Sequence, residues 1–108
     1  MRLNGTQVFI EILIDLIISG DYKYIILCGK VFVNILKKFI VKEKKHTFKM
    51  EKQDGSETKN NYEVINITVK HKSSEITLCI APQFAQYGLQ GCLLEQYGEK
   101  VRELYGKF

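Results

Sequence analysis

The chain has 108 residues, of which 45% are hydrophobic and 26% charged, and its formal net charge is +4. This length fits one domain, residues 1–108, that can bury a core, and the composition excludes both a disordered chain and a membrane protein. The sixteen basic residues include only two arginines, and the many Lys, Ile, Asn and Tyr residues indicate AT-rich coding, typical of a low-GC bacterium or its phage.

Residues 4–20 predict an N-terminal helix. Its polar residues recur every four positions, at Gln7, Glu11, Asp15 and Ser19. Almost all residues between them are apolar, so we expect neighbouring elements to cover most of the helix circumference. The apolar run is too short, and too often interrupted by acidic residues, to span a bilayer, and we expect no membrane association.

Residues 24–28 (YIILC) form a short, continuous apolar run, which predicts a strand buried on both faces in a parallel sheet. Gly29 and Lys30 follow at once, and a helical pattern begins at about Val31 with an apolar face that reaches Ile40. A glycine between a strand and a helix can let an anionic ligand approach the helix N-terminus, or it can form only a tight turn. Both interpretations stay open.

The rest of the chain predicts three strands and a helix. The strands are expected at residues 46–51, 62–71 and 75–81. Asp54 and Gly55 indicate a turn, Pro82 ends the last strand, and apolar residues at helical spacing predict a helix from about Cys92 to Tyr105. The order α-β-α-β-β-β-α predicts one small α/β domain, with α+β as the alternative, in which helices flank a mixed sheet.

Two segments would meet at one edge of this sheet if residues 24–28 and 75–81 were parallel neighbours. Open α/β sheets bind ligands at the carboxyl ends of their strands, and here that edge offers apolar, stacking and hydrogen-bonding groups. The predicted partner-binding residues are Lys30, Gln83, Phe84, Gln86 and Tyr87. The alternative is that the two aromatic residues dock the last helix onto the core.

A lysine-rich stretch suggests a second binding surface. Basic side chains on one helix face can neutralise the phosphates of DNA or RNA. The predicted nucleic-acid-binding residues are Lys37, Lys38, Lys42 and Lys45. Glu43 interrupts this cluster, and the alternative is a solvated helix face.

The residue types that usually carry catalysis are poorly placed in this sequence. His46 and His71 have no acidic or cysteine companion at the spacing of a metal site or a general base, and we expect both at exposed strand ends. Cys28 lies in the most apolar run, without the neighbouring base that a nucleophile needs. We therefore predict no catalytic residue, no metal and no cofactor.

The cysteines indicate a reducing compartment. Cys28, Cys79 and Cys92 are an odd set without metal-site spacing. We expect Cys28 and Cys79 to be buried free thiols, because each lies in an apolar run where a thiol acts as a small hydrophobic group. This pattern fits a cytoplasmic protein, here in a bacterial host cell.

Residues 9–40 and 76–91 together resemble the C-terminal half of the uracil-DNA glycosylase superfamily. The resemblance implies that Gly29 and Lys30 match the turn at the end of a strand, and that Ala81–Gly88 match the loop that enters the DNA minor groove. Family enzymes have a histidine where this chain has Ala81, and their water-activating and uracil-stacking residues belong to an N-terminal half without a counterpart here. The resemblance thus implies DNA contact without base excision.

These observations predict a non-enzymatic interaction protein of a phage or mobile element. Its expected partner is a nucleic acid, DNA or RNA, or a protein or ribonucleoprotein complex that handles nucleic acid, and an anti-CRISPR-type inhibitor is one concrete version. Two alternatives remain open. One is a uracil-DNA glycosylase-like enzyme fragment, and the other is a self-associating structural subunit, for example a homodimer that covers a strand edge.

Overall fold

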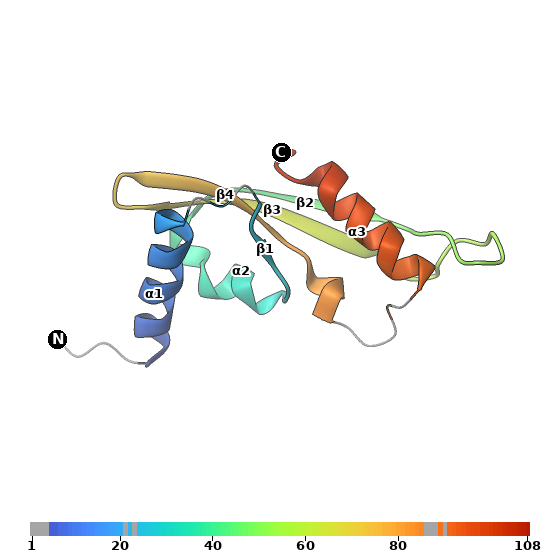
Figure 1. The fold of residues 1–108 in the computed structure, drawn as a ribbon, viewed down its shortest axis with the longest axis horizontal. Helices are drawn as coiled ribbons and strands as arrows, with labels where there is room; N and C mark the ends of the chain where they lie inside the picture. The colour runs from blue at the N-terminus through green and yellow to red at the C-terminus, as the bar shows by residue number, and fades with distance from the viewer. Residues whose placement is uncertain (1–4, 21, 23, 86–88, 90) are drawn as a thin grey trace.

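The computed structural model describes residues 5–20, 22, 24–85, 89 and 91–108. Its elements in chain order are α1 (Gly5–Ser19), β1 (Ile26–Leu27), α2 (Val31–Ile35), the 3₁₀ turn η1 (Lys37–Phe39), β2 (Ile40–Phe48), β3 (Tyr62–His71), β4 (Ser74–Ile80), the 3₁₀ turn η2 (Pro82–Ala85) and α3 (Cys92–Leu104). Figure 1 shows these elements. The predicted element order and the α/β or α+β class, with a mixed sheet flanked by helices, are confirmed.

The sheet has four strands in the order β1-β4-β3-β2. β1 pairs with β4 in parallel, through Ile26 with Cys79 and Leu27 with Ile80, and the other neighbours are antiparallel. The sheet-edge prediction required residues 24–28 and 75–81 to be parallel neighbours, and β1 and β4 are. β1 is nevertheless an edge strand of only two residues, so the expectation of a strand buried on both faces is wrong.

Two core clusters lie on opposite faces of the sheet. Alternate residues of β3 face the two sides of the sheet, so Val64 belongs to one cluster and Ile65, Ile67 and Val69 belong to the other. The cluster beneath α1 and α2 comprises Ile14, Ile17, Leu36, Ile65, Ile67, Val69, Leu78 and Ile80. The cluster beneath α3 comprises Met50, Val64, Cys79, Ala81, Tyr97 and Val101. Helices on both faces give the protein three layers.

The boundary between the second helix and the next strand differs from the prediction. α2 ends at Ile35, and β2 begins at Ile40, about six residues before the expected strand. The physical reason is pairing: β2 aligns with β3 from Ile40 opposite Val69 to Phe48 opposite Tyr62. In this strand, the backbone N–H and C=O groups of the lysine-rich segment form hydrogen bonds with β3. In the predicted longer helix, the same groups would have bonded within the helix.

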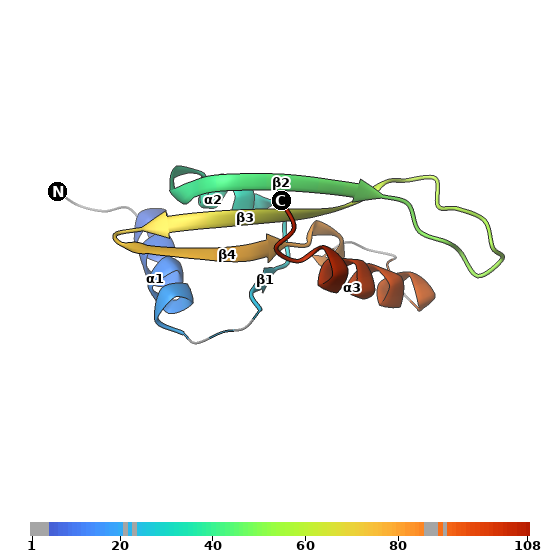
Figure 2. The same cartoon turned by 90° about the horizontal axis from the view of Figure 1, so that it is seen from above.

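The molecule is elongated, with extents of 57 × 25 × 20 Å and a radius of gyration of 15.6 Å. A compact chain of this length has a radius of gyration of about 13 Å. The β3–β4 hairpin and the β2–β3 connection lie at opposite ends of the long axis (Figure 2). None of the helices in the described residues is long and apolar enough to cross a membrane.

Candidate functional site

One face of α1 is apolar and exposed to solvent. Ile14 and Ile17 are buried against the sheet, whereas Ile12 and Leu16 are 54% and 57% exposed. The expectation that neighbours cover most of this helix is therefore wrong. The reason is that α1 contacts the sheet mainly through β4, and a sheet face can bury only one stripe of a helix.

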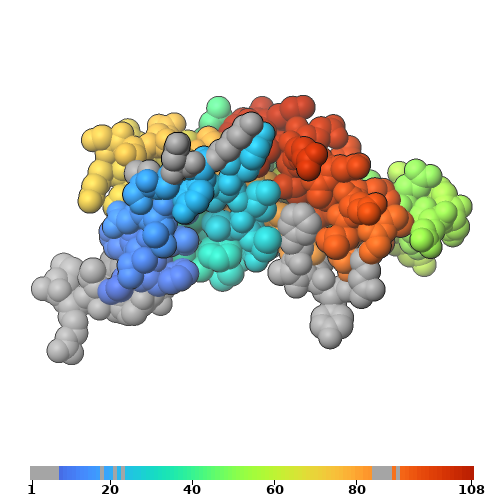
Figure 3. Space-filling view, viewed as in Figure 1, coloured from blue at the N-terminus to red at the C-terminus, as the bar shows by residue number. Residues whose placement is uncertain are grey.

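The exposed apolar side chains continue from α1 to the open edge of β1. We define the α1–β1 surface by its exposed large apolar residues, which are Val8, Phe9, Ile12, Leu16, Tyr22, Tyr24 and Ile26. α1 and the segment that follows it lie side by side on the face seen in Figure 3. Contiguous exposed apolar area of this kind is typical of binding surfaces.

The backbone of β1 presents hydrogen-bonding groups toward solvent. The amides of Cys79 and Ala81 donate to the carbonyls of Ile25 and Leu27, at 3.0 and 2.9 Å. Because successive residues of a strand alternate their direction, the N–H and C=O of Ile26 point away from β4. The sheet order places no further strand of the described residues on that side.

A tyrosine hydroxyl interrupts the ladder between β1 and β4. Tyr105 Oη accepts a hydrogen bond from the amide of Ile25 at 2.8 Å, and it lies 3.2 Å from the carbonyl of Thr77, to which it can donate. It takes the place of a direct bond between the two strands, which explains why β1 is so short. Burial raises the pKa of Tyr105, so its hydroxyl stays protonated and can serve as both donor and acceptor.

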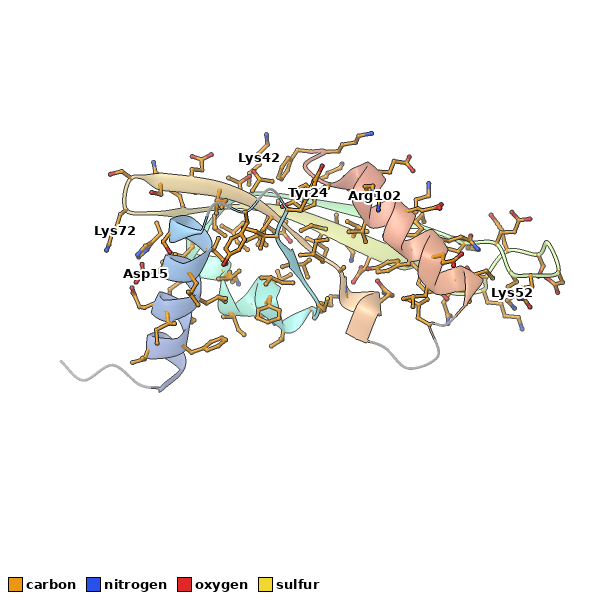
Figure 4. The ribbon with its side chains drawn as sticks, in the orientation of Figure 1. Asp15, Tyr24, Lys42, Lys52, Lys72 and Arg102 are labelled. Carbon is orange, nitrogen blue, oxygen red and sulfur yellow. The ribbon has the colours of Figure 1, made fainter. Side chains whose placement is uncertain are left out.

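Two grooves flank the edge of β1. One has a volume of about 430 Å³ and is lined by Tyr24, Ile26, Gly98, Val101, Arg102 and Tyr105, so it lies between β1 and α3. The other, about 310 Å³, is lined by Leu16, Ile17, Tyr22, Tyr24, Ile25 and Ile26, so it lies between β1 and α1. Tyr24 and Ile26 belong to both grooves, and Figure 4 shows Tyr24 beside Arg102.

Sequence reasoning missed the α1–β1 surface. The available signal was a helix that is apolar almost all round in a chain with few other elements to cover it. A single sheet face and one short helix cannot bury such a helix completely. The surplus apolar residues had to be exposed or bound by something else.

At the predicted sheet edge, the structure brings Lys30 and Gln83 together around Glu63. Lys30 Nζ lies 3.3 Å from Glu63 Oε1, and Lys45 Nζ lies 3.1 Å from Glu63 Oε2. Partial burial alone would raise the pKa of Glu63, but the hydrogen bonds and charges of Lys45 and Lys30 outweigh it and lower that pKa. Glu63 is a carboxylate held between two ammonium groups.

Gln83 is a packing residue, although we expected it to contact a partner. It is only 6% exposed, and its Oε1 accepts hydrogen bonds from the amide of Glu63 at 3.2 Å and from Tyr97 Oη at 3.0 Å. Burial raises the pKa of Tyr97, whose hydroxyl also lies 2.7 Å from the carbonyl of Glu63. The side chain of Gln83 thus ties η2 to β3 and α3.

The other residues predicted at this edge cannot be placed in the same way. Phe84 belongs to η2, but its side chain lies outside the described residues, as do Gln86 and Tyr87. Of the five residues predicted to contact a partner, Lys30 is therefore the one whose side chain is described and exposed.

The predicted lysine cluster does not form one helix face. Lys37 and Lys38 are exposed in η1, whereas Lys42 and Lys45 belong to β2. Because Lys42 is opposite Thr68 and Lys45 is opposite Ile65, these two side chains lie on different faces of the sheet. Lys42 Nζ is 4.6 Å from the ring centroid of Phe108, and Lys45 pairs with Glu63.

The histidines differ from the predicted exposed strand ends. His46 Nε2 lies 2.7 Å from the carbonyl of Lys107. His71 is largely covered, so the expectation of an exposed position is wrong for it, and its Nε2 lies 3.8 Å from Glu11 and 4.0 Å from Asp15. The sequence hid this contact because the partners are about sixty residues away along the chain.

The cysteines differ in their exposure to solvent. Cys79 is buried, and burial together with the neighbouring Cys28 raises its pKa to about 12. Cys28 is exposed, contrary to our expectation, because it lies just beyond the short edge strand β1. Among the described residues, no three or more His, Cys, Asp and Glu side chains are grouped so that they could hold a metal ion.

Comparisons of this chain with models of protein families, with curated proteins and with solved structures found no match. The resemblance to the glycosylase superfamily therefore stays a prediction.

Proposed function

We propose that this chain is a non-enzymatic interaction protein that binds a partner protein through the α1–β1 surface. The observation that carries this proposal is the exposure of a connected set of large apolar side chains on α1 and β1. More than half of the surface of Ile12 and Leu16 stays in contact with water in the free chain, and that part does not contribute to its stability. Burying them against a partner is favourable, at about 25 cal/mol per Å² of apolar area.

The charges around this surface favour a protein over a nucleic acid or a lipid. The described residues of α1 include Glu11 and Asp15 but neither lysine nor arginine. Carboxylates repel phosphate groups, and helices that lie in a membrane interface are usually rich in basic residues. A protein surface with its own apolar patch is the partner that fits.

We further propose that the partner belongs to a nucleic-acid-handling complex and that the setting is a phage or mobile element, as for an anti-CRISPR-type inhibitor. The support for this finer proposal is compositional. The chain has a net charge of +4 and is rich in lysine but poor in arginine.

Direct contact with DNA or RNA is a second candidate function. The exposure of Lys37 and Lys38 in η1, just before β2, favours it. The parallel pairing of β1 with β4 also places Gly29 and Ala81 near the same end of the sheet, as the glycosylase resemblance implies.

Site-specific photocrosslinking tests the proposed function. A benzophenone amino acid replaces Ile12 in one variant and Val41, which is equally exposed on β2, in a matched control. Each variant is expressed in the host cell and irradiated there. We expect one protein to crosslink strongly from position 12 and weakly from position 41, and the same protein, once identified and purified, to bind the chain.

Charged substitutions on the surface complete this test. The double variant Ile12→Asp, Leu16→Asp should fold normally, because both side chains are more than half exposed, and it should lose the purified partner. Equal crosslinking from positions 12 and 41 would contradict the proposed function. Crosslinking only to nucleic acid or only to a second copy of the chain would also contradict it.

A further inference from the structure

We propose that the α1–β1 surface binds its partner by strand addition. In this arrangement an extended, mainly apolar segment of the partner, with one carboxylate side chain, pairs with the open edge of β1. This inference rests on the proposed function and specifies the form of the partner. Three features of the described residues support it: the direction of the β1 backbone, the position of the two grooves, and the charge at one rim.

The backbone of Ile26 can pair with an added strand. Its N–H and C=O point away from β4, because the groups that bond β4 belong to Ile25 and Leu27. An edge strand with outward backbone groups is the usual site of strand addition, in which main-chain hydrogen bonds provide much of the affinity.

The grooves match the alternation of side chains along an added strand. Successive side chains of an extended peptide point to opposite faces of a sheet. Beside β1, one face opens into the groove beneath α1 and the other into the groove beneath α3, and both grooves include Tyr24 and Ile26. An added strand would therefore place alternate side chains in the two grooves, which gives it a preferred sequence pattern.

The groove beneath α3 carries a positive charge at its rim. Arg102 is exposed and lines this groove together with apolar side chains, and none of the ion pairs between described residues includes it. A guanidinium group binds a carboxylate through two parallel hydrogen bonds. The partner segment should therefore carry an Asp or Glu at a position that points toward α3.

The shape of the site favours a slender segment over a second copy of this chain. Residues of α1 and α3 form the outer walls of the two grooves, so helices stand on either side of the β1 edge (Figure 3). A second copy that offered its own β1 would bring its own two flanking helices into the same space. A single extended segment fits between them.

Selection from a phage-displayed heptapeptide library, built from Val, Tyr, Asp, Ser and Lys only, tests this inference. The bait is the full chain. We expect enriched peptides to alternate apolar residues with others and to carry Asp at one fixed position. Arg102→Gln should remove the preference for Asp over Ser at that position while leaving binding of the apolar pattern in place.

Two variants at Ile26 form a matched pair for the backbone contact. Ile26→Ala shortens the side chain but keeps the outward N–H, whereas Ile26→Pro removes that N–H without removing a bond to β4. An enriched peptide should bind the proline variant about tenfold more weakly than the alanine variant, as expected for one missing hydrogen bond. In the unmodified chain, the same peptide should slow hydrogen exchange of the Ile26 amide, which tests the contact even if a variant unfolds.

Several outcomes would overturn strand addition. Strand addition would be contradicted if the library gave no enriched peptide. It would also be contradicted if the enriched peptides left hydrogen exchange of the Ile26 amide unchanged. Sedimentation that shows a dimer of the unmodified chain and a monomer of the proline variant would assign the edge to a second copy. If the peptides fail but crosslinking from position 12 identifies a partner, the proposed function stands and only strand addition fails.

Discussion

At the scale of single residues, Glu63 links β3 to β2, to the start of α2, to η2 and to α3. Its carboxylate pairs with Lys30 and Lys45, and its backbone bonds Gln83 and Tyr97. Because its pKa is lower in the folded protein than in the unfolded chain, its contribution to stability is fully present above the unfolded value. That contribution is lost as the pH falls through the folded value.

We therefore expect Glu63→Gln to make stability less dependent on pH in the acidic range. Urea unfolding between pH 6 and pH 3 should show a smaller loss of free energy of unfolding in this variant than in the unmodified chain. Glu57→Gln is the control, since Glu57 is exposed and should leave the pH profile unchanged. Parallel profiles for the unmodified chain and Glu63→Gln would mean that the two ion pairs do not stabilise the fold.

At the scale of elements, Asn66 holds the end of α3 onto the sheet. Its side chain is fully buried in β3, and Nδ2 donates to the carbonyls of Leu104 and Lys107 at 2.7 and 2.9 Å. Its Oδ1 accepts from the amide of Gly106 at 3.1 Å. One side chain thus satisfies three backbone groups where the helix ends.

Asn66→Ala should lower the free energy of unfolding by about 3 kcal/mol, because it removes three hydrogen bonds that are each worth about 1 kcal/mol. Thr68→Val, at the next position of the same strand face, is the control. Among the described residues, the hydroxyl of Thr68 bonds the hydroxyl of Thr77, so removing it should cost about 1 kcal/mol or less. Chemical denaturation measures both values, and equal small losses would show that water replaces the asparagine.

The elements differ in how well the sequence predicted them. β4 and α3 were predicted almost to the residue, since a proline ends one and regular apolar spacing defines the other. The start of β2 was missed, because the apolar residues from Val31 to Ile40 also fit a helix. Pairing with β3, which no local pattern in this segment reveals, decided between the two conformations.

At the scale of the whole molecule, the basic residues are dispersed. If nucleic acid binds through η1, the double variant Lys37→Gln, Lys38→Gln should reduce the slope of log affinity against log salt concentration by about two, because each lysine neutralises one phosphate. Fluorescence anisotropy with labelled duplex DNA measures this slope. The control removes Lys49 and Lys52, which are exposed just beyond the other end of β2. An unchanged slope in the η1 variant would leave Lys37 and Lys38 as solvated side chains.

The candidate site was harder to predict than the fold. The sheet-edge prediction was conditional on parallel pairing of β1 with β4, and this pairing is present, with Lys30 and Gln83 both bonded to Glu63. The sequence did not predict the burial of Gln83 or the exposure of α1, because both depend on how much surface the folded chain can cover. Sequence patterns show which side chains are apolar, but only the packed structure shows which of them remain in solvent.

The elongated shape has a consequence for the stability and abundance of the protein in a cell. The molecule exposes 7440 Å², whereas a compact monomer of this mass would expose about 6,200 Å². Less burial per residue leaves a smaller margin against unfolding, and any partner that binds only the folded chain adds to that margin by mass action. Unbound copies would then unfold more often and be degraded faster than bound ones, so the abundance of this protein would follow the abundance of its partner.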